Sequence, residues 1–93
     1  MPVRINTPES IAVKERFLRS FEELRYRGIV SLKSEFARNV GLGTASNLNR
    51  MENNRREPAI VNVLLLHQKY NVSIEWIMFG MGDFLCEDKK SKK

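Results

Sequence analysis

The sequence is poor in residues that form covalent or metal cross-links, with one cysteine, Cys86, and one histidine, His67, among its 93 residues. A single cysteine excludes an intramolecular disulfide, and the two residues form no cluster with metal-ligand spacing. We therefore expect no metal, no cofactor and a reducing cytoplasm as the compartment. His67 has no nearby acid or second ligand, so we expect it to have a partly buried, structural role.

Long apolar runs are also lacking, since none exceeds four residues, as in Val63–Leu66. A helix that crosses a bilayer needs about 20 mainly apolar residues, and residues 1–6 do not follow the basic-then-apolar pattern of a signal peptide. The chain also has no pairing of a nucleophile with a base and no glycine-rich phosphate loop. We therefore expect neither a membrane protein nor an enzyme with a small-molecule substrate.

The composition that remains is that of a soluble globular protein, 42% hydrophobic and 29% charged, at a length that suits one domain. Helical periodicity predicts an all-α domain over residues 7–85, between a mobile arm at residues 1–6 and a charged, disordered tail at residues 86–93. Helix starts or caps are expected at Thr7–Pro8, Ser31, Thr44, Pro58 and Ser73, and helix ends at Gly28, Gly41, Asn53–Asn54, Tyr70 and Gly80.

Apolar stripes along these helices predict which side chains are buried. A stripe of Ile60, Val63, Leu64 and His67 would suffice to pack the fourth helix. The additional apolar residues Val61 and Leu65 therefore need a second partner, either other helices or another subunit. Elsewhere the expected buried residues are Ile11, Val13, Phe17, Leu18, Phe21, Leu24, Ile29 and Val30, and the expected solvated ones include Lys14 and Arg16.

Residues 35–52 predict a short helix, a glycine turn and a second short helix. Gly41 and Gly43 can take positive φ at little steric cost and so turn the chain sharply. Leu48 and Met51 share one face of the second helix, which leaves a small, polar face outward. Such a face suits the major groove of DNA, but an ordinary helical hairpin has the same spacing. The outward residues are Ala45, Ser46, Asn47, Asn49 and Arg50.

Basic residues are concentrated around this segment. Residues 25–56 hold seven basic and two acidic residues, a net charge of +5, whereas the rest of the chain holds nine of each and is neutral. A localised positive charge raises affinity for a polyanion and accelerates encounter with it. The distribution of charge therefore favours double-stranded DNA as the partner over a plain helical hairpin.

Four sequence blocks occur in a familiar order: Glu35–Gly41, Leu48–Glu52, Arg55–Pro58 and Asn71–Gly82. In this order the chain resembles the Cro and phage-repressor helix-turn-helix family (the lambda-repressor-like, xenobiotic-response-element type) over about residues 10–85. Two departures stand out. The turn before Leu48 has one residue more than is usual in the family, which we assign to Leu42 or Gly43, and Asn54 stands where the family usually has glycine.

The resemblance implies a compact five-helix, lambda-repressor-like fold in which the third helix enters the major groove and the second crosses the DNA backbone. It also implies that Ala45, Ser46 and Arg50 face the bases, with Asn47 and Asn49 next to them. Arg50 is the best candidate for a guanine contact. The implied backbone contacts are Lys33, Thr44, Asn53, Arg55 and Arg56.

The function that we expect is a sequence-specific, DNA-binding transcriptional regulator that binds a two-fold operator as a homodimer, with half-sites about 34 Å apart. Met81, Phe84 and Leu85 are the candidates for the dimer contact, and packing under the first helix is the alternative for them. Two other functions remain open. One is an antitoxin or restriction-system control protein of the same fold, and the other is a protein-interaction module that retains the fold without binding DNA.

Overall fold

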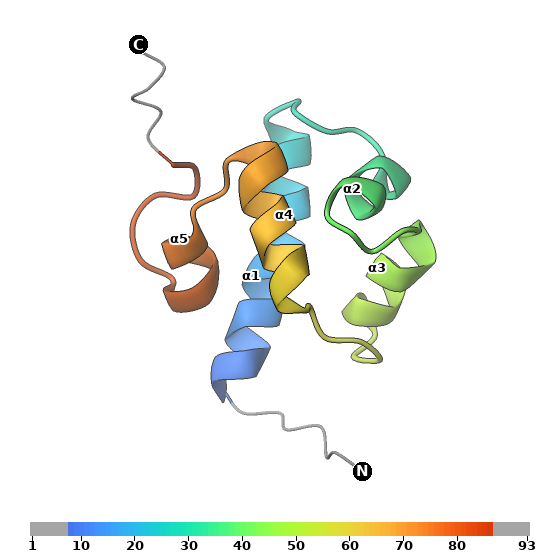
Figure 1. Cartoon of the computed structure of the whole chain (residues 1–93), viewed down its shortest axis with the longest axis horizontal. Helices are drawn as coiled ribbons and strands as arrows, with labels where there is room; N and C mark the ends of the chain where they lie inside the picture. Colours follow the sequence, from blue (N-terminus) through green and yellow to red (C-terminus); the bar gives the residue numbers. More distant parts are fainter. Residues whose placement is uncertain (1–7, 87–93) are drawn as a thin grey trace.

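In the computed structural model, which describes residues 8–86, five α-helices surround one core (Figure 1). They are α1 (Pro8–Tyr26), α2 (Lys33–Asn39), α3 (Ala45–Glu52), α4 (Ile60–Tyr70) and α5 (Ile74–Phe79). The α2–α3 pair lies on one side of α1 and α4, and α5 lies on the other (Figure 1). The described residues contain no strand, only an isolated bridge between Val72 and Leu85. The all-α prediction is confirmed, whereas the expected arm at residues 1–6, Thr7 and residues 87–93 lie outside the described residues.

Three helices begin where their sequence signals predict. α1 begins at Pro8, a position where the lack of an amide proton costs no hydrogen bond within the helix. α3 follows an N-cap residue at Thr44, although its hydroxyl accepts no hydrogen bond from the described helix. α5 follows Ser73, whose Oγ accepts a hydrogen bond from the backbone nitrogen of Trp76 at 3.2 Å. α5 is therefore capped at both ends. Ser73 caps its N-terminus, and Gly80 ends it in the left-handed conformation, with a φ of +71°.

The starts of α2 and α4 differ from the prediction. The N-cap position of α2 is held by Leu32, so Ser31 lies one residue too early to cap the helix. The N-cap position of α4 is held by Ala59, so Pro58 precedes the helix and does not start it. Neither Leu32 nor Ala59 has a side-chain oxygen, and in α4 the Oδ1 atom of Asn62 accepts the Ala59 amide proton instead, at 2.8 Å.

An aromatic cluster joins three helices at the centre of the core. The ring of Phe36 in α2 lies 6.0 Å from that of Phe17 and 5.1 Å from that of Phe21, both in α1. Tyr70 at the end of α4 stacks on Phe36 at 5.7 Å, and its hydroxyl accepts a hydrogen bond from Asn39. Tilted ring pairs of this kind stabilise a core beyond the area that they bury. α2 is therefore held against both long helices.

The burial pattern of α4 differs in its first two turns from what its apolar stripe predicts. Asn62, its one polar residue in the first two turns, is only 1% exposed, whereas Ile60 is 71% and Val61 53% exposed. The amide of Asn62 is bonded on both sides, because its Nδ2 atom also donates to the Val40 carbonyl at 2.8 Å. Leu64 is exposed as well. The first turns of α4 therefore bury an amide and leave apolar side chains outward.

Of the other positions that the sequence predicts to be buried, some are buried and some are exposed. Val63 of α4 is buried as expected, and so are Phe17, Phe21 and Leu24 of α1. Ile11 and Ile29 are exposed, although the sequence predicts burial. Both of these residues lie near an end of α1, where fewer neighbouring elements are available to cover them.

The turn between α2 and α3 passes directly under α4. The Ala37 carbonyl accepts hydrogen bonds from the amides of Leu42 at 2.8 Å and Gly43 at 3.1 Å, which closes the end of α2. Gly41 has a φ of +86°, and a Cβ atom there would lie 2.8 Å from Leu65 Cδ1 and 3.3 Å from Asn62 Nδ2. Gly41 is therefore required both for its backbone conformation and for the space that α4 occupies.

We predict that Gly41→Ala destabilises the protein more than Gly43→Ala. Both glycines have positive φ, so each substitution carries the strain of a left-handed alanine, about 1–2 kcal/mol. Only Gly41 has no room for a Cβ atom, and displacing Leu65 or Asn62 should add about 1–3 kcal/mol. Urea unfolding of the two variants measures the difference, and equal midpoints would mean that α4 does not press on this turn.

Candidate nucleic-acid interface

α2 and α3 pack together through side chains that are fully buried. Phe36 and Ala37 of α2 and Leu48 and Met51 of α3 have no exposed surface. Leu42, in the turn, is also in the core at 3% exposure. The small side chain of Ala37 allows the two helices to cross closely, as the sequence suggests. These contacts leave one side of α3 without a covering element among the described residues.

The outward side of α3 carries four exposed polar residues at helical spacing. Ser46, Asn49, Arg50 and Asn53 follow one another at i, i+3, i+4 and i+7, and Ala45 beside them is half-buried. Arg50 forms no ion pair with any described residue, so its guanidinium group remains available to a ligand. This surface, Ser46–Asn49–Arg50–Asn53, offers short hydrogen-bonding groups and one long cation, and we refer to it as the outward face of α3.

Asn47 does not belong to this face, in contrast to the expectation from the sequence. Its Nδ2 atom donates to the carbonyl of Leu42 at 2.6 Å, and the side chain is half-buried. The amide group thus ties the first turn of α3 back to the preceding turn. The helical register explains this position, because Asn47 adjoins the buried Leu48 and lies four residues before the buried Met51.

Lys33 and Glu52 form an ion pair across the two helices. The Nζ atom of Lys33, the first residue of α2, lies 3.1 Å from Glu52 Oε1 at the end of α3 and donates to Asn49 Oδ1 at 2.9 Å. Both charged side chains are about one-third exposed. A cation in the first turn of a helix opposes the helix dipole, and a nearby anion offsets this cost. In this structure that anion is Glu52.

The loop after α3 begins with a left-handed asparagine. Asn54 has a φ of +62°, a conformation that asparagine tolerates better than most residues. The amide of Arg55 donates to the Arg50 carbonyl at 2.7 Å, which fixes the loop to the end of the helix. Arg55 is exposed, whereas Arg56 is half-buried and its Nε atom is enclosed with no hydrogen-bond partner among the described residues. Of the two loop arginines, Arg55 is therefore the more accessible to a ligand.

Lys14 is buried, although the sequence places it among solvated charges. It is 5% exposed, and its Nζ atom donates to Asn54 Oδ1 at 2.5 Å and to Glu57 Oε2 at 3.4 Å. A buried cation is tolerated only when it is paired and hydrogen-bonded. The signal was available in the sequence, because Lys14 is in helical register with the buried Phe17 and Phe21. Lys14 thus connects α1 to the loop that follows α3.

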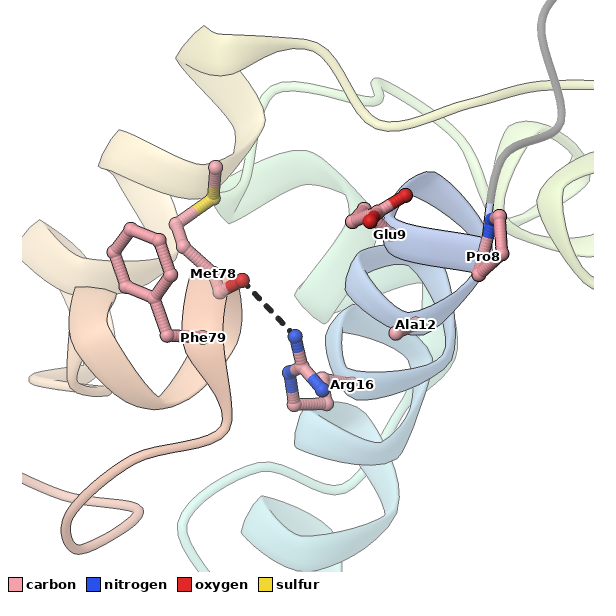
Figure 2. A pocket seen from close by; sticks show the side chains of 6 residues that line it. All are labelled: Pro8, Glu9, Ala12, Arg16, Met78 and Phe79. Carbon is pink, nitrogen blue, oxygen red and sulfur yellow. Dashed lines mark hydrogen bonds between the residues drawn. The ribbon is translucent and has the colours of Figure 1, made fainter.

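Arg16 is likewise engaged in the fold and not solvated. Its guanidinium group donates to the carbonyls of Ile77 at 2.7 Å and Met78 at 3.0 Å, at the end of α5 where helix carbonyls lack partners. Figure 2 shows this contact beside a shallow, open hollow of about 310 Å³ between α1 and α5. Of its six lining residues only Glu9 and Arg16 are ionisable, and Arg16 is already bonded. The hollow therefore contains no recognisable catalytic set.

The basic residues of the segment 25–56 lie in two separate regions of the structure. Arg27 pairs with Glu23 at 3.1 Å and lies over the ring of Phe84 at 5.3 Å, away from the helix pair. Arg25, also at the end of α1, lies over Phe21 at 5.8 Å. The positive surface near α3 is therefore smaller than the charge of residues 25–56 suggests. The basic residues on or beside the helix pair are Lys33, Arg38, Arg50, Arg55 and Arg56.

Two of the three dimer candidates are occupied within the chain. Phe84 packs edge-on against Trp76 with ring centroids 4.8 Å apart, and Leu85 pairs with Val72 and packs against the core. These contacts correspond to the intramolecular alternative that the sequence left open. Met81 is 62% exposed. Among the candidates, only Met81 is free for a contact with another molecule.

Among the described residues, His67 makes local contacts and no metal-binding group occurs. His67 lies with Nδ1 3.0 Å from the Val72 carbonyl and 3.7 Å from Cys86 Sγ, which agrees with a structural role. Within residues 8–86, no group of three or more histidine, cysteine, aspartate or glutamate residues could hold a metal ion. No helix of this part of the chain is both long and apolar enough to cross a membrane.

We predict that Lys14→Met lowers the free energy of unfolding by about 1–3 kcal/mol, because it leaves Asn54 and Glu57 without their charged donor. The matched control is Lys69→Met, an exposed position on α4 where a change below about 0.5 kcal/mol is expected. Urea denaturation gives both values. Similar stability of the two variants would show that the buried contact does not hold the loop.

Comparison of the chain with protein-family models, with curated proteins and with solved structures finds no match. A functional assignment therefore rests on the geometry of this chain. It consists of a short helix with an uncovered polar face, a preceding helix that crosses it, and an arginine-bearing loop held beside its end.

Proposed function

We propose that this protein is a sequence-specific, DNA-binding transcriptional regulator with a lambda-repressor-like arrangement of its five helices, in which α2 and α3 form the helix-turn-helix. The observation that carries the proposal is the outward face of α3, whose exposed polar residues include the unpaired Arg50. The resemblance of four sequence blocks to the Cro and phage-repressor family agrees with it. The packing of α2 against α3 supports the same assignment.

In this proposal α3 enters the major groove with its outward face toward the bases. Arg50 bonds O6 and N7 of a guanine, which is the commonest specific contact of arginine in DNA complexes. Ser46 and Asn49 bond neighbouring base edges, and the methyl group of Ala45 packs against a thymine methyl group. The backbone contacts position the protein without reading sequence. They come from Lys33, Thr44, Asn53, Arg55 and Arg56.

The longer turn sets the direction in which α3 points. Leu42 is a core residue, whereas Gly43 is exposed, has a φ of +89° and has no heavy atom near the place of a Cβ atom. We therefore assign the additional residue to Gly43. With Thr44 at the N-cap, Asn47 is no longer among the residues proposed to read bases. Those that remain are Ala45, Ser46, Asn49 and Arg50.

The proposal includes a homodimer, because one module of this size makes few base contacts and two-fold repetition doubles them. The dimer contact needs apolar surface that the monomer leaves uncovered. Phe79 and Met81, at and after the end of α5, are 69% and 62% exposed. Phe79 therefore joins Met81 as a candidate for the contact, in place of Phe84 and Leu85.

A second candidate function is binding to another protein. Both the protein-interaction module and the antitoxin alternative would bind a protein partner. The observation that favours it is the exposed apolar side of α4, formed by Ile60, Val61 and Leu64. Exposed apolar patches often mark protein-binding surfaces. A protein that uses only this surface would not need the polar outward face of α3, so DNA binding separates the two functions.

Selection of binding sites from random duplex DNA tests the proposal directly. We predict enrichment of a two-fold sequence whose half-sites are centred about 34 Å apart. A population that shows no enrichment after repeated selection would contradict sequence-specific binding and favour the protein-interaction module.

Arg50→Ala should then weaken binding to the selected site by about 1–3 kcal/mol and relax the preference at one base pair. Its matched control is Arg55→Ala, which removes the same kind of side chain from the loop after α3. Arg55 is a proposed backbone contact, so its loss should weaken binding to every sequence alike. Equal losses on specific and random DNA for Arg50→Ala would contradict its base-reading role.

For the dimer, we predict that Phe79→Ser combined with Met81→Ser lowers the mass measured by sedimentation at micromolar concentration from that of a dimer to that of a monomer. The control is Ile60→Ser combined with Val61→Ser, which removes a similar exposed apolar surface from α4. Dissociation by the control pair instead would move the contact to α4, and a monomeric wild-type protein would contradict a stable free dimer.

A further inference from the structure

The ion pair between Lys33 and Glu52 has an unusual position for both partners. Lys33 is the first residue of α2, and Glu52 is the last residue of α3. A cation is disfavoured near the positive end of a helix, and an anion is disfavoured near the negative end. Each side chain therefore opposes its own helix and is stabilised by the other, at 3.1 Å.

The pair also lies at the edge of the outward face of α3. Asn49 belongs to that face, and its Oδ1 atom accepts a hydrogen bond from the same Lys33 Nζ atom at 2.9 Å. Both charged side chains are partly exposed, Lys33 at 34% and Glu52 at 37%. A polyanion that approaches α3 would therefore meet a lysine whose charge is already neutralised and a carboxylate that repels it.

We propose that Glu52 is a counter-charge that a DNA backbone phosphate must displace from Lys33, and that it thereby lowers the sequence-independent part of the affinity for DNA. This inference rests on the proposed function. In the free protein Lys33 is bonded to Glu52 and Asn49. In the complex the phosphate takes the lysine, and Glu52 loses its partner close to a negative strand.

The exchange of Glu52 for a phosphate predicts how DNA affinity depends on salt concentration. A lysine that binds a phosphate normally releases about one counterion from DNA, so it steepens the dependence of log K on log salt by about 0.9. Here the carboxylate released from Lys33 attracts a cation in turn, which offsets that gain. Lys33 should therefore add little to affinity or to the salt slope as long as Glu52 is present, and it should add both when Glu52 is neutral.

The test is Glu52→Gln, measured by titration of a short duplex of mixed sequence at several salt concentrations. We expect affinity at about 0.1 M salt to rise about 1.5-fold to fivefold, the range that corresponds to one exposed charge pair. The salt slope should steepen by about 0.9. Adding Lys33→Gln to Glu52→Gln should abolish both gains, because no lysine is then left for the phosphate to bind.

The matched control is Glu23→Gln. Glu23 also pairs at 3.1 Å, with Arg27, and its exposure of 40% is close to that of Glu52. The control changes the net charge by the same amount but on α1, outside the α2–α3 pair. The comparison is made at about 0.1 M salt, where the influence of an exposed charge is screened beyond about 10 Å. It should therefore leave affinity and slope close to those of the wild-type protein.

The outcomes separate the inference from the proposed function. If Glu52→Gln behaves like Glu23→Gln, or binds more weakly than the wild-type protein, Glu52 is not a counter-charge and the inference is wrong. Thermal unfolding followed by circular dichroism identifies a variant that is weak because it is unfolded, and the conservative Glu52→Asp then replaces it, with wild-type binding expected. If the folded wild-type protein binds no duplex even at low salt, the proposed function itself fails.

Discussion

The position of α3 depends on one buried amide. Asn62 accepts the Ala59 amide proton with Oδ1, which begins α4, and donates to the Val40 carbonyl with Nδ2, which ends α2. An apolar side chain of similar size would leave the buried Val40 carbonyl unpaired, a loss of about 1–3 kcal/mol, and would remove the acceptor of the partly buried Ala59 amide. Gly41 makes the contact possible, since a Cβ atom there would collide with α4. The same two residues therefore fix where α2 ends and where the chain turns toward α3.

A second buried contact holds the other end of α3. Lys14 reaches from α1 to Asn54 and Glu57, in the loop that leaves the helix. Because α3 has only eight residues, it would be marginal alone and depends on its neighbours for stability. With both ends fixed by polar contacts and one side packed through Leu48 and Met51, the opposite side can remain uncovered. Rigid support of this kind is what a binding surface on a short helix requires.

Much of this architecture could be predicted from the sequence, but the buried polar contacts could not. Helical periodicity, together with Pro8, Thr44 and Ser73, was sufficient to locate the five helices in outline. Lys14 was wrongly expected to be solvated, and the burial of Asn62 was not predicted, because their partners lie 40 and 22 residues away along the chain. A polar residue in register with buried ones is the available signal, but its partner is defined only by the tertiary fold. The exposure of Ile60 and Leu64 was missed for the same reason, whereas Val61 was expected to need a second partner.

The fold leaves less positive charge available near α3 than the composition suggests. Arg27 is paired with Glu23, Lys33 with Glu52, and the Nε atom of Arg56 is enclosed. A regulator with this surface would be attracted to any duplex less strongly than its formal charge implies. Discrimination would then depend more on Arg50 and the short polar side chains beside it, since non-specific attraction adds equally to every site. Within residues 8–86, the cations near α3 that are exposed and outside any ion pair are Arg38, Arg50 and Arg55.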